Sequence, residues 1–304
     1  MKTTGKSAFT LLEMLVVIGI IGILMGVALT QFGGSTESAK AAKCESNMKN
    51  LVTAAHTCAL QQDDGFFPPA GSFSYPMVDL KKSEIVYHNY RVGWISGSEY
   101  RPGVSQHAIG WQAIPFNADE LSIRHALTNG NRGAMWKALS GSRASYLCPV
   151  HSEAARKLIG HMPGWSYAMN QEFGYEDTAD KNHKERFWGK TKDEANSSRL
   201  LMFAELQGAD IKAPGYEEIK AASYLKAGVP LADAILDYKK ENIGFNHKIG
   251  KRGFTGHVAF TDGHVEKLFY PKSSGGISLQ KLTEALCLGH EISYDGKGYK
   301  DLNQ

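Results

Sequence analysis

Residues 8–13 read Ala8-Phe9-Thr10-Leu11-Leu12-Glu13, and an unbroken apolar run follows from Met14 to Leu29. The segment 9–29 would form a helix about 31 Å long, which matches the apolar core of a bilayer. The residues before it are polar, and their only charges are Lys2 and Lys6. Lysines on that side favour keeping the amino end in the cytoplasm. This segment therefore predicts a single membrane-spanning helix with the rest of the chain on the far side.

Glu13 distinguishes this segment from ordinary export signals. A secretory signal peptide has an apolar run of about 7–15 residues followed by a small-x-small cleavage site. Here the run is longer, and Thr30-Gln31-Phe32-Gly33-Gly34 is a poor cleavage site. An ordinary signal anchor fits the length but leaves Glu13 unexplained. A charge within an apolar segment is costly, so it indicates a function and needs a partner.

Residues 8–13 resemble the cleavage and methylation motif of type IV pilins and type II secretion pseudopilins. The resemblance implies that a prepilin peptidase cuts after Ala8 and that Phe9 is then N-methylated. It also implies a partner for Glu13, namely the amino group of Phe9 on a neighbouring subunit of a fibre. Opposite charges in an apolar bundle offset each other's desolvation and define the register between helices. Ala8 replaces the family's usual glycine, which implies slower processing.

The same resemblance implies an α+β, pilin-like fold. A long N-terminal helix would pack on an antiparallel β-sheet that carries loop and helical insertions. We expect a leader at 1–8, a transmembrane and assembly helix at 9–32, an amphipathic second half at 33–63 and a globular domain at 64–304. Gly33-Gly34 is a weak helical point where the chain could bend. Beyond it, apolar residues recur at helical spacing: Ala41, Cys44, Met48, Leu51, Val52, Ala55 and Ala59.

The body resembles a pseudopilin-like family of Planctomycetes and Verrucomicrobia that carries a processing-associated domain, histidine then nine residues then Asp-Gly. The similar segments are 44–50, 64–68, Cys148-Pro149, 166–170 and the element from His247 to Val265. The match departs from the pattern because fourteen residues separate His247 from Asp262. Asp262-Gly263, between two alternating stretches, predicts a hairpin with a tight primed turn. We expect Val258 and Phe260 to share a face with Val265 and Lys267.

The four cysteines, Cys44, Cys58, Cys148 and Cys287, include no Cys-x-x-Cys pair, which excludes a zinc ribbon or a thioredoxin-like motif. An even number in an exported protein permits two disulfides. Cys44 and Cys58 lie about 21 Å apart on one helix, so they cannot bond each other. Two pairings stay open: Cys44–Cys148 with Cys58–Cys287, or the crossed alternative. Buried free thiols are the other interpretation.

Metal binding and catalysis are the further alternatives. His257 and His264, with the Asp262 carboxylate, are candidate metal ligands near the hairpin, but exposed or hydrogen-bonded histidines explain them as well. We expect no resident cofactor, with a loop-bound calcium ion as the alternative. Cys148 with His151 or His161 is the nearest approach to a cysteine nucleophile, yet the resemblance to the pseudopilin-like family implies that Cys148-Pro149 contributes half of a disulfide. We therefore expect a protein that is not an enzyme.

A net charge of +3 with scattered basic residues argues against a nucleic-acid-binding protein. The sequence instead predicts a structural subunit of a type II secretion or type IV pilus-like fibre. Its partners would be the prepilin peptidase/methyltransferase, other pilin or pseudopilin subunits and the inner membrane. The body would lie in the periplasm, in a periplasmic or surface fibre. A membrane-tethered enzyme or ligand-binding domain with a borrowed anchor is the alternative.

Overall fold

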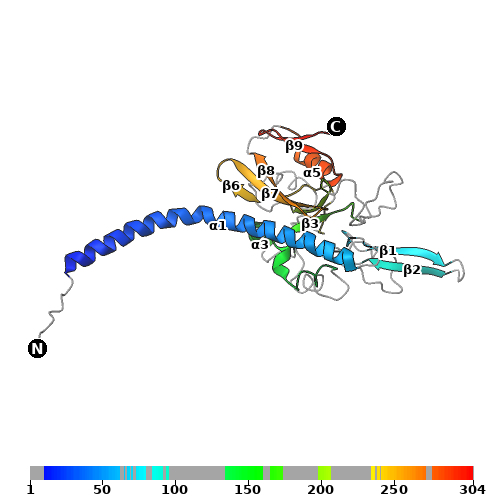
Figure 1. The fold of residues 1–304 in the computed structure, drawn as a ribbon, viewed down its shortest axis with the longest axis horizontal. Coiled ribbons are helices and arrows are strands. Elements are labelled where there is room, and N and C mark those ends of the chain that lie inside the picture. Colours follow the sequence, from blue (N-terminus) through cyan, green and yellow to red (C-terminus); the bar gives the residue numbers. More distant parts are fainter. Residues whose placement is uncertain are drawn as a thin grey trace, which may run out of the picture.

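The structure is a computed structural model. It describes residues 10–61, 65, 67–68, 70, 73–79, 84–91, 94–95, 134–159, 165–173, 198–206, 234–236, 238–239, 241–271 and 276–303. Side chains are described for these residues except 26–35, 73–79, 84–91, 155, 158–159 and 235. One long helix lies beside a body built around a β-sheet (Figure 1).

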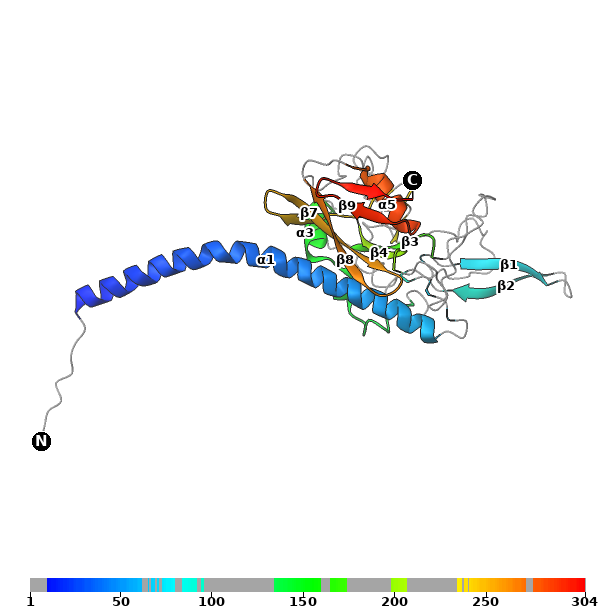
Figure 2. The same cartoon turned by 45° about the horizontal axis from the view of Figure 1, so that its top comes forward.

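The helix α1 runs from Leu11 to Gln61, and its first half projects from the body (Figures 1 and 2). It passes through Gly33-Gly34 without interruption and curves gently, so this predicted weak point is helical. The second half packs on the body through the predicted apolar stripe, of which every member except the half-buried Ala41 is buried. Helical spacing therefore predicted the packing face of α1 correctly.

Among the residues with described side chains, no helix combines the length and the apolar character needed to cross a membrane. Of the predicted segment 9–32, Phe9 and the side chains of residues 26–32 lie outside the described part.

The central sheet has six strands in the order β5-β3-β4-β7-β6, with β8 also paired to β7. All pairs are antiparallel except β3 with β5. Along β7, one edge pairs with β8, and the other pairs first with β6 and then with β4. The strands are β3 (Tyr167–Asn170), β4 (Leu201–Glu205), β5 (Ile235–Leu236), β6 (His247–Ile249), β7 (Gly253–Phe260) and β8 (Val265–Pro271).

Smaller elements complete the body. The second half of α1 contacts β4, β6, β7 and β8 together with η2 and α3. The helix α5 packs on β4 and on the C-terminal hairpin β9–β10, and a separate hairpin, β1–β2, lies beyond the carboxyl end of α1 (Figure 1). Their bounds are β1 (Phe73–Asp79), β2 (Glu84–Arg91), η2 (Arg143–Tyr146), α3 (Pro149–Ile159), α5 (Leu279–Cys287), β9 (Ile292–Tyr294) and β10 (Tyr299–Asp301). The expected α+β, pilin-like arrangement of a long helix on an antiparallel sheet is confirmed.

The β7–β8 hairpin is present, but two details of its prediction were wrong. Its loop has three residues, because Gly263 N donates to Phe260 O and Phe260 N donates to His264 O. Gly263 has φ +97°, which is the glycine-bulge loop rather than a two-residue primed turn. Val258 pairs with Glu266, and Val265 pairs with Ala259. Paired residues share a face, so Val265 lies on the opposite face from Val258.

Candidate functional site

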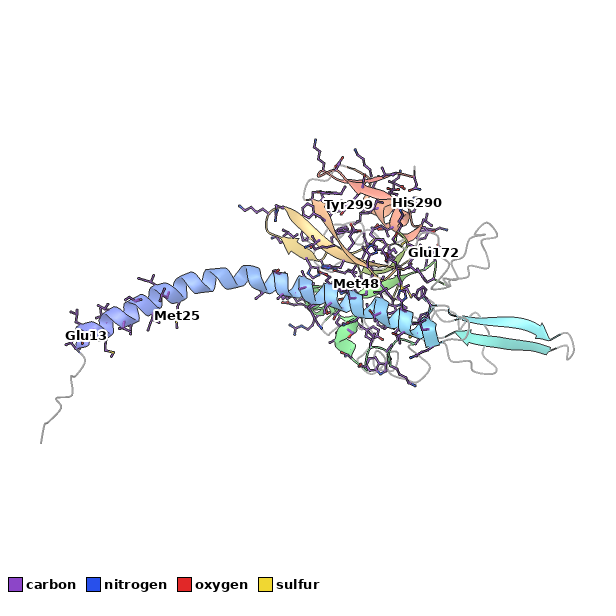
Figure 3. All side chains as sticks on the ribbon, viewed as in Figure 1. Glu13, Met25, Met48, Glu172, His290 and Tyr299 are labelled. Atoms are coloured by element: carbon purple, nitrogen blue, oxygen red, sulfur yellow. The ribbon has the colours of Figure 1, made fainter. Side chains whose placement is uncertain are left out.

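The projecting half of α1 exposes its apolar side chains. Between Leu11 and Met25 the large apolar residues have exposed fractions from 44% for Ile21 to 82% for Leu11. Figure 3 shows Glu13 and Met25 on this projecting part, and Met48, which is fully buried, where the helix crosses the body. The sequence therefore builds one helix with two environments: the body covers the second half, and nothing in the described chain covers the first.

Thr10 and Glu13 cap the start of α1. The Glu13 carboxylate accepts hydrogen bonds from Thr10 N at 2.8 Å and Thr10 Oγ1 at 2.9 Å, while Glu13 N donates to Thr10 Oγ1 at 3.2 Å. This reciprocal pair is a capping box. The Thr-x-x-Glu spacing was the sequence signal for it, and sequence reasoning assigned Glu13 only to a contact between subunits. Ala8 and Phe9, the predicted cleavage and methylation residues, lie outside the described residues.

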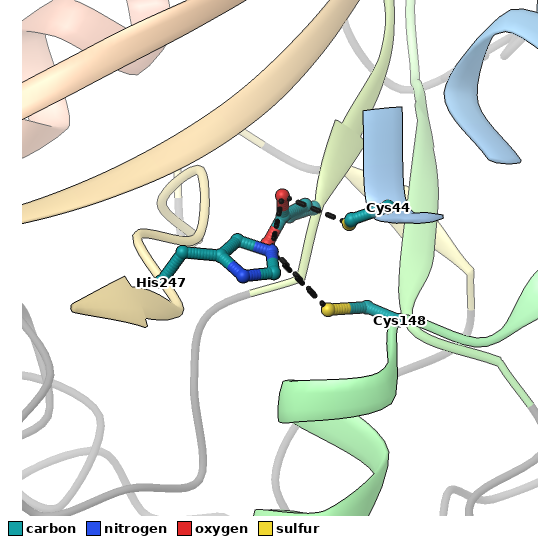
Figure 4. Close-up of side chains that lie close together, drawn as sticks. Cys44, Cys148 and His247 are labelled. Carbon is teal, nitrogen blue, oxygen red and sulfur yellow. Dashed lines mark hydrogen bonds and ion pairs between the residues drawn. The ribbon is translucent and has the colours of Figure 1, made fainter. Parts of the chain in front are cut away.

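Four potential metal ligands meet inside the body: Cys44, Cys148, Glu205 and His247 (Figure 4). Their ligand atoms all lie within 4.8 Å of one another, and we call them the Cys-Cys-Glu-His cluster. Cys44 and Cys148 have no exposed surface, and neither has Glu205; His247 is 3% exposed. The cluster is therefore sealed from solvent between α1 and the sheet.

Each member of the cluster comes from a different element. Cys44 is on the buried face of α1, and Cys148 immediately precedes α3. Ser152 N donates to Cys148 O at 2.8 Å, so the Cys148 thiol lies at the positive amino end of that helix. Glu205 ends β4, and His247 begins β6. Residues from 44 to 247 thus meet at one point only because of the tertiary fold.

A close backbone approach holds the His247 segment against the sheet. A Cβ on Gly256 of β7 would lie 2.0 Å from Gly244 O, and a Cβ on Gly244 would lie 2.1 Å from Leu206 O. Only glycine fits such contacts, since any side chain would collide with the backbone. The two glycines therefore bring the chain before His247 onto the end of β4, where Glu205 lies.

The contacts within the cluster are short. His247 Nε2 lies 3.3 Å from Glu205 Oε1 and 3.5 Å from Cys148 Sγ. Cys44 Sγ lies 3.1 Å from Glu205 Oε1, and Cys148 Sγ lies 4.0 Å from Glu205 Oε2. The four groups thus surround a common point instead of forming a chain of separate pairs.

Electrostatic coupling changes the ionisation of every member. Burial alone would raise the pKa of Glu205, but His247 and His257 bring that pKa well below its usual range. Burial would lower the pKa of His247, and the Glu205 carboxylate raises it instead. Burial raises the pKa of Cys44, whereas hydrogen bonds from Cys44 and His247 outweigh burial and lower the pKa of Cys148. Without a metal, the cluster is therefore a buried Glu205–His247 ion pair flanked by two thiols.

A second layer of donors surrounds the cluster. His257 donates to Glu205 Oε1 from its backbone N at 3.0 Å, and its Nδ1 lies 2.7 Å from the same oxygen. Asn246 Nδ2 donates to Glu205 Oε2 at 2.8 Å. The Tyr167 hydroxyl lies 3.2 Å from Cys44 Sγ and accepts from Asn47 Nδ2 at 3.3 Å. These contacts orient the carboxylate and one sulfur from outside, as partners of metal ligands do.

Cys148, His247 and Glu205 have the residue types of a nucleophile, a base and an orienting carboxylate. Their burial argues against such chemistry, because an attacking sulfur must reach its substrate. A surface pocket of about 270 Å³ lies nearby between α1 and α3, but its lining includes no member of the cluster. The residues that line it are Lys43, Ala144, Leu147, Pro149, Ser152, Glu153 and Arg156. The arrangement therefore suits a structural role.

The four cysteines lie at three separate places in the body, and two of them meet in the cluster. All four cysteines are buried thiols, so neither predicted disulfide pairing is formed in it and both stay predictions. Cys44 and Cys148 lie together in the cluster, whereas Cys58 Sγ donates to Ala134 O at 3.4 Å. Cys287 ends α5, where its carbonyl accepts from Asn170 Nδ2 at 2.9 Å.

The residues predicted as metal ligands near the hairpin also lie apart from one another. His257 is buried behind Glu205, whereas Asp262 and His264 contact each other at the exposed hairpin loop, with 2.5 Å between Nδ1 and Oδ1. These three therefore do not form one metal site. His151, the predicted partner of Cys148, contacts Ser166 Oγ at 2.9 Å instead, and His161 lies outside the described residues.

Local sequence patterns do not reveal the cluster, because its four ligands lie far apart in the chain. Cys44, Cys148 and His247 were each noted in separate segments, and Glu205 was not noted. Its signal was a carboxylate at the end of the apolar strand Leu201–Glu205, where a buried charge requires a partner.

Comparison with known proteins addresses the amino terminus. Residues 4–29 match the family described as the prokaryotic N-terminal methylation motif, and no family is found for the body. The resemblance of the body to the planctomycete and verrucomicrobial family therefore stays a prediction. No curated protein and no solved structure matches the chain. The matched motif implies a pilin-like protein that is processed by a prepilin peptidase and anchored in a membrane.

Proposed function

We propose that this chain is a structural, non-enzymatic subunit of a type II secretion or type IV pilus-like fibre. The observation that carries the proposal is the apolar first half of α1, which projects from the body and whose large apolar side chains are exposed from Leu11 to Met25. Burying such a helix against copies of itself or related helices is the favourable step in assembly. Identical head-to-tail contacts that do not close would extend into a fibre.

In this proposal the chain is inserted once in the inner membrane with its body in the periplasm. Cleavage after Ala8 exposes the amino group of Phe9, which is then N-methylated. Glu13 pairs with this amino group on a neighbouring subunit, and the pair defines the axial register of the helices. The exposed carboxylate of Glu13 at the start of α1 supports this role, although the carboxylate also caps its own helix.

Two substitutions separate pairing from capping. Glu13→Gln keeps an acceptor for Thr10 N at the capping position but removes the charge, whereas Glu13→Ala removes both. We expect both variants to insert in the membrane at wild-type levels and to be depleted from fibres, as measured by co-assembly with tagged wild-type subunits. If Glu13→Gln enters fibres as the wild type does, Glu13 acts by capping and the pairing role is wrong.

The mature amino terminus distinguishes the fibre subunit from a membrane-tethered enzyme or ligand-binding domain. We expect mass spectrometry of the chain, co-expressed with its prepilin peptidase, to find N-methyl-Phe9 as the first residue. An intact Met1, or a cut beyond Leu29, would instead support the tethered alternative.

A further inference from the structure

We propose that Cys44, Cys148, Glu205 and His247 bind one tetrahedral zinc ion that fastens α1 to the body. The inference is independent of the fibre function, since it concerns the interior of a single subunit. It also replaces the expectation that the chain carries no resident metal.

The first argument is the chemistry of the donor set. Two sulfurs, one imidazole nitrogen and one carboxylate oxygen are ligands of a borderline-soft ion with tetrahedral preference. Calcium and magnesium take oxygen ligands only, so the calcium alternative does not fit this cluster. Four protein ligands and complete burial are features of a structural zinc site, because a catalytic site keeps one position open to water.

The second argument is geometric. Zinc–sulfur bonds of about 2.3 Å and zinc–nitrogen or zinc–oxygen bonds of about 2.0–2.1 Å place sulfur about 3.6 Å from nitrogen or oxygen, and nitrogen about 3.3 Å from oxygen. The cluster has 3.5 Å between Cys148 Sγ and His247 Nε2, and 3.3 Å between His247 Nε2 and Glu205 Oε1. The sulfur–oxygen distances involve different carboxylate oxygens, because Cys44 Sγ lies 3.1 Å from Glu205 Oε1 and Cys148 Sγ lies 4.0 Å from Glu205 Oε2. All four ligand atoms lie within 4.8 Å of one another. Small rotamer shifts would therefore close the tetrahedron.

The third argument concerns charge. Two thiolates and a carboxylate would repel one another strongly in a buried site, and a divalent cation removes most of that repulsion. The zinc site would keep one net negative charge, which the surrounding hydrogen-bond donors stabilise. His257 and Asn246 donate to Glu205, and the Tyr167 hydroxyl lies 3.2 Å from Cys44 Sγ. Zinc would replace the thiol protons that now occupy the space between these ligands.

A Cys44–Cys148 disulfide is the competing explanation. It would use two of the four convergent groups and would leave Glu205 and His247 as a buried ion pair beside it. The zinc site accounts for all four groups at once, and it explains why three elements and α1 meet at this point. The disulfide is therefore an outcome that the experiment must be able to detect.

The test is metal analysis of the full-length chain, purified in detergent from cells grown with zinc. Mass spectrometry of the metal content should find about one zinc ion per chain, as expected for a closed structural site. Cys148→Ser and Glu205→Gln should each lose most of it. Cys58→Ser, which changes another buried cysteine of α1, should retain it.

Because a ligand variant could also lose zinc by misfolding, the wild type supplies the second measurement. X-ray absorption at the zinc edge should give two sulfur and two nitrogen or oxygen neighbours. The proposal is overturned if the wild type carries no zinc, if its zinc has no sulfur neighbours, or if non-reducing peptide mapping finds Cys44 linked to Cys148.

Discussion

Asn47 shows what a single polar side chain contributes to the docking of α1. It is fully buried on the helix face that packs on the body, and its Nδ2 donates to Ala144 O at 3.1 Å and Leu147 O at 2.8 Å. Those carbonyls belong to the turn that leads into Cys148 and α3. Asn47 therefore supports both the helix contact and the position of one cluster ligand.

Replacing Asn47 with alanine should lower the free energy of unfolding by about 1–3 kcal/mol, because buried carbonyl groups lose their donor. The matched control is Asn50→Ala on the exposed face of the same helix, where we expect a change within about 0.5 kcal/mol. Chemical denaturation of the full chain in detergent measures both. Equal effects of the two substitutions would contradict the role assigned to Asn47.

Residue identity alone does not show which histidines can bind a metal. His257 and His264 are of one type and flank the same loop, yet the first lies behind Glu205 and the second stacks on Phe260 at a centroid distance of 4.4 Å. The position of a histidine in the folded chain decides whether it can reach a metal site, since strand register and burial differ between neighbouring positions.

At the scale of elements, local pattern predicted what local forces determine. The apolar stripe of α1 and the β7–β8 hairpin follow from periodicity, which the sequence displays directly. The details of the hairpin do not, because Asp-Gly is compatible with loops of two or three residues. The added loop residue changed which side chains share a face.

Gly263 tests that loop. Its φ of +97° disfavours any residue with a Cβ, while the nearest atom to such a Cβ is His56 Nε2 at 3.9 Å, so the cost is conformational rather than steric. Gly263→Ala should lower the free energy of unfolding by about 1 kcal/mol or more. Gly263→Asn should cost less, because asparagine tolerates left-handed backbone. Thermal unfolding of the two variants compares them, and an alanine variant as stable as the wild type would contradict the assigned loop.

At the scale of the whole molecule, the Cys-Cys-Glu-His cluster joins the projecting helix to the sheet. If it holds zinc, a chelator should lower the melting temperature of the full chain, because a ligand that binds only the folded state stabilises it. Free zinc at a hundred times its dissociation constant contributes about 2.7 kcal/mol, which corresponds to a shift of about 5–10 °C.

The control for this experiment is Cys148→Ser, whose melting temperature should not respond to the chelator. Differential scanning calorimetry of both proteins, with and without chelator, makes the comparison. An equal response of the variant and the wild type would place the chelator's effect elsewhere in the chain.

The sequence by itself determined the features that depend on neighbouring residues: the anchor, its processing motif, the packing face of α1 and the existence of the hairpin. These features depend on residues close together in the sequence, so periodicity and short motifs reveal them. Only the tertiary structure decided that Cys44, Cys148, Glu205 and His247 share one buried point. Contacting pairs within that cluster are 42–161 residues apart in the chain. No local pattern encodes such a meeting, because it follows from strand order, helix docking and the close approach of two glycines.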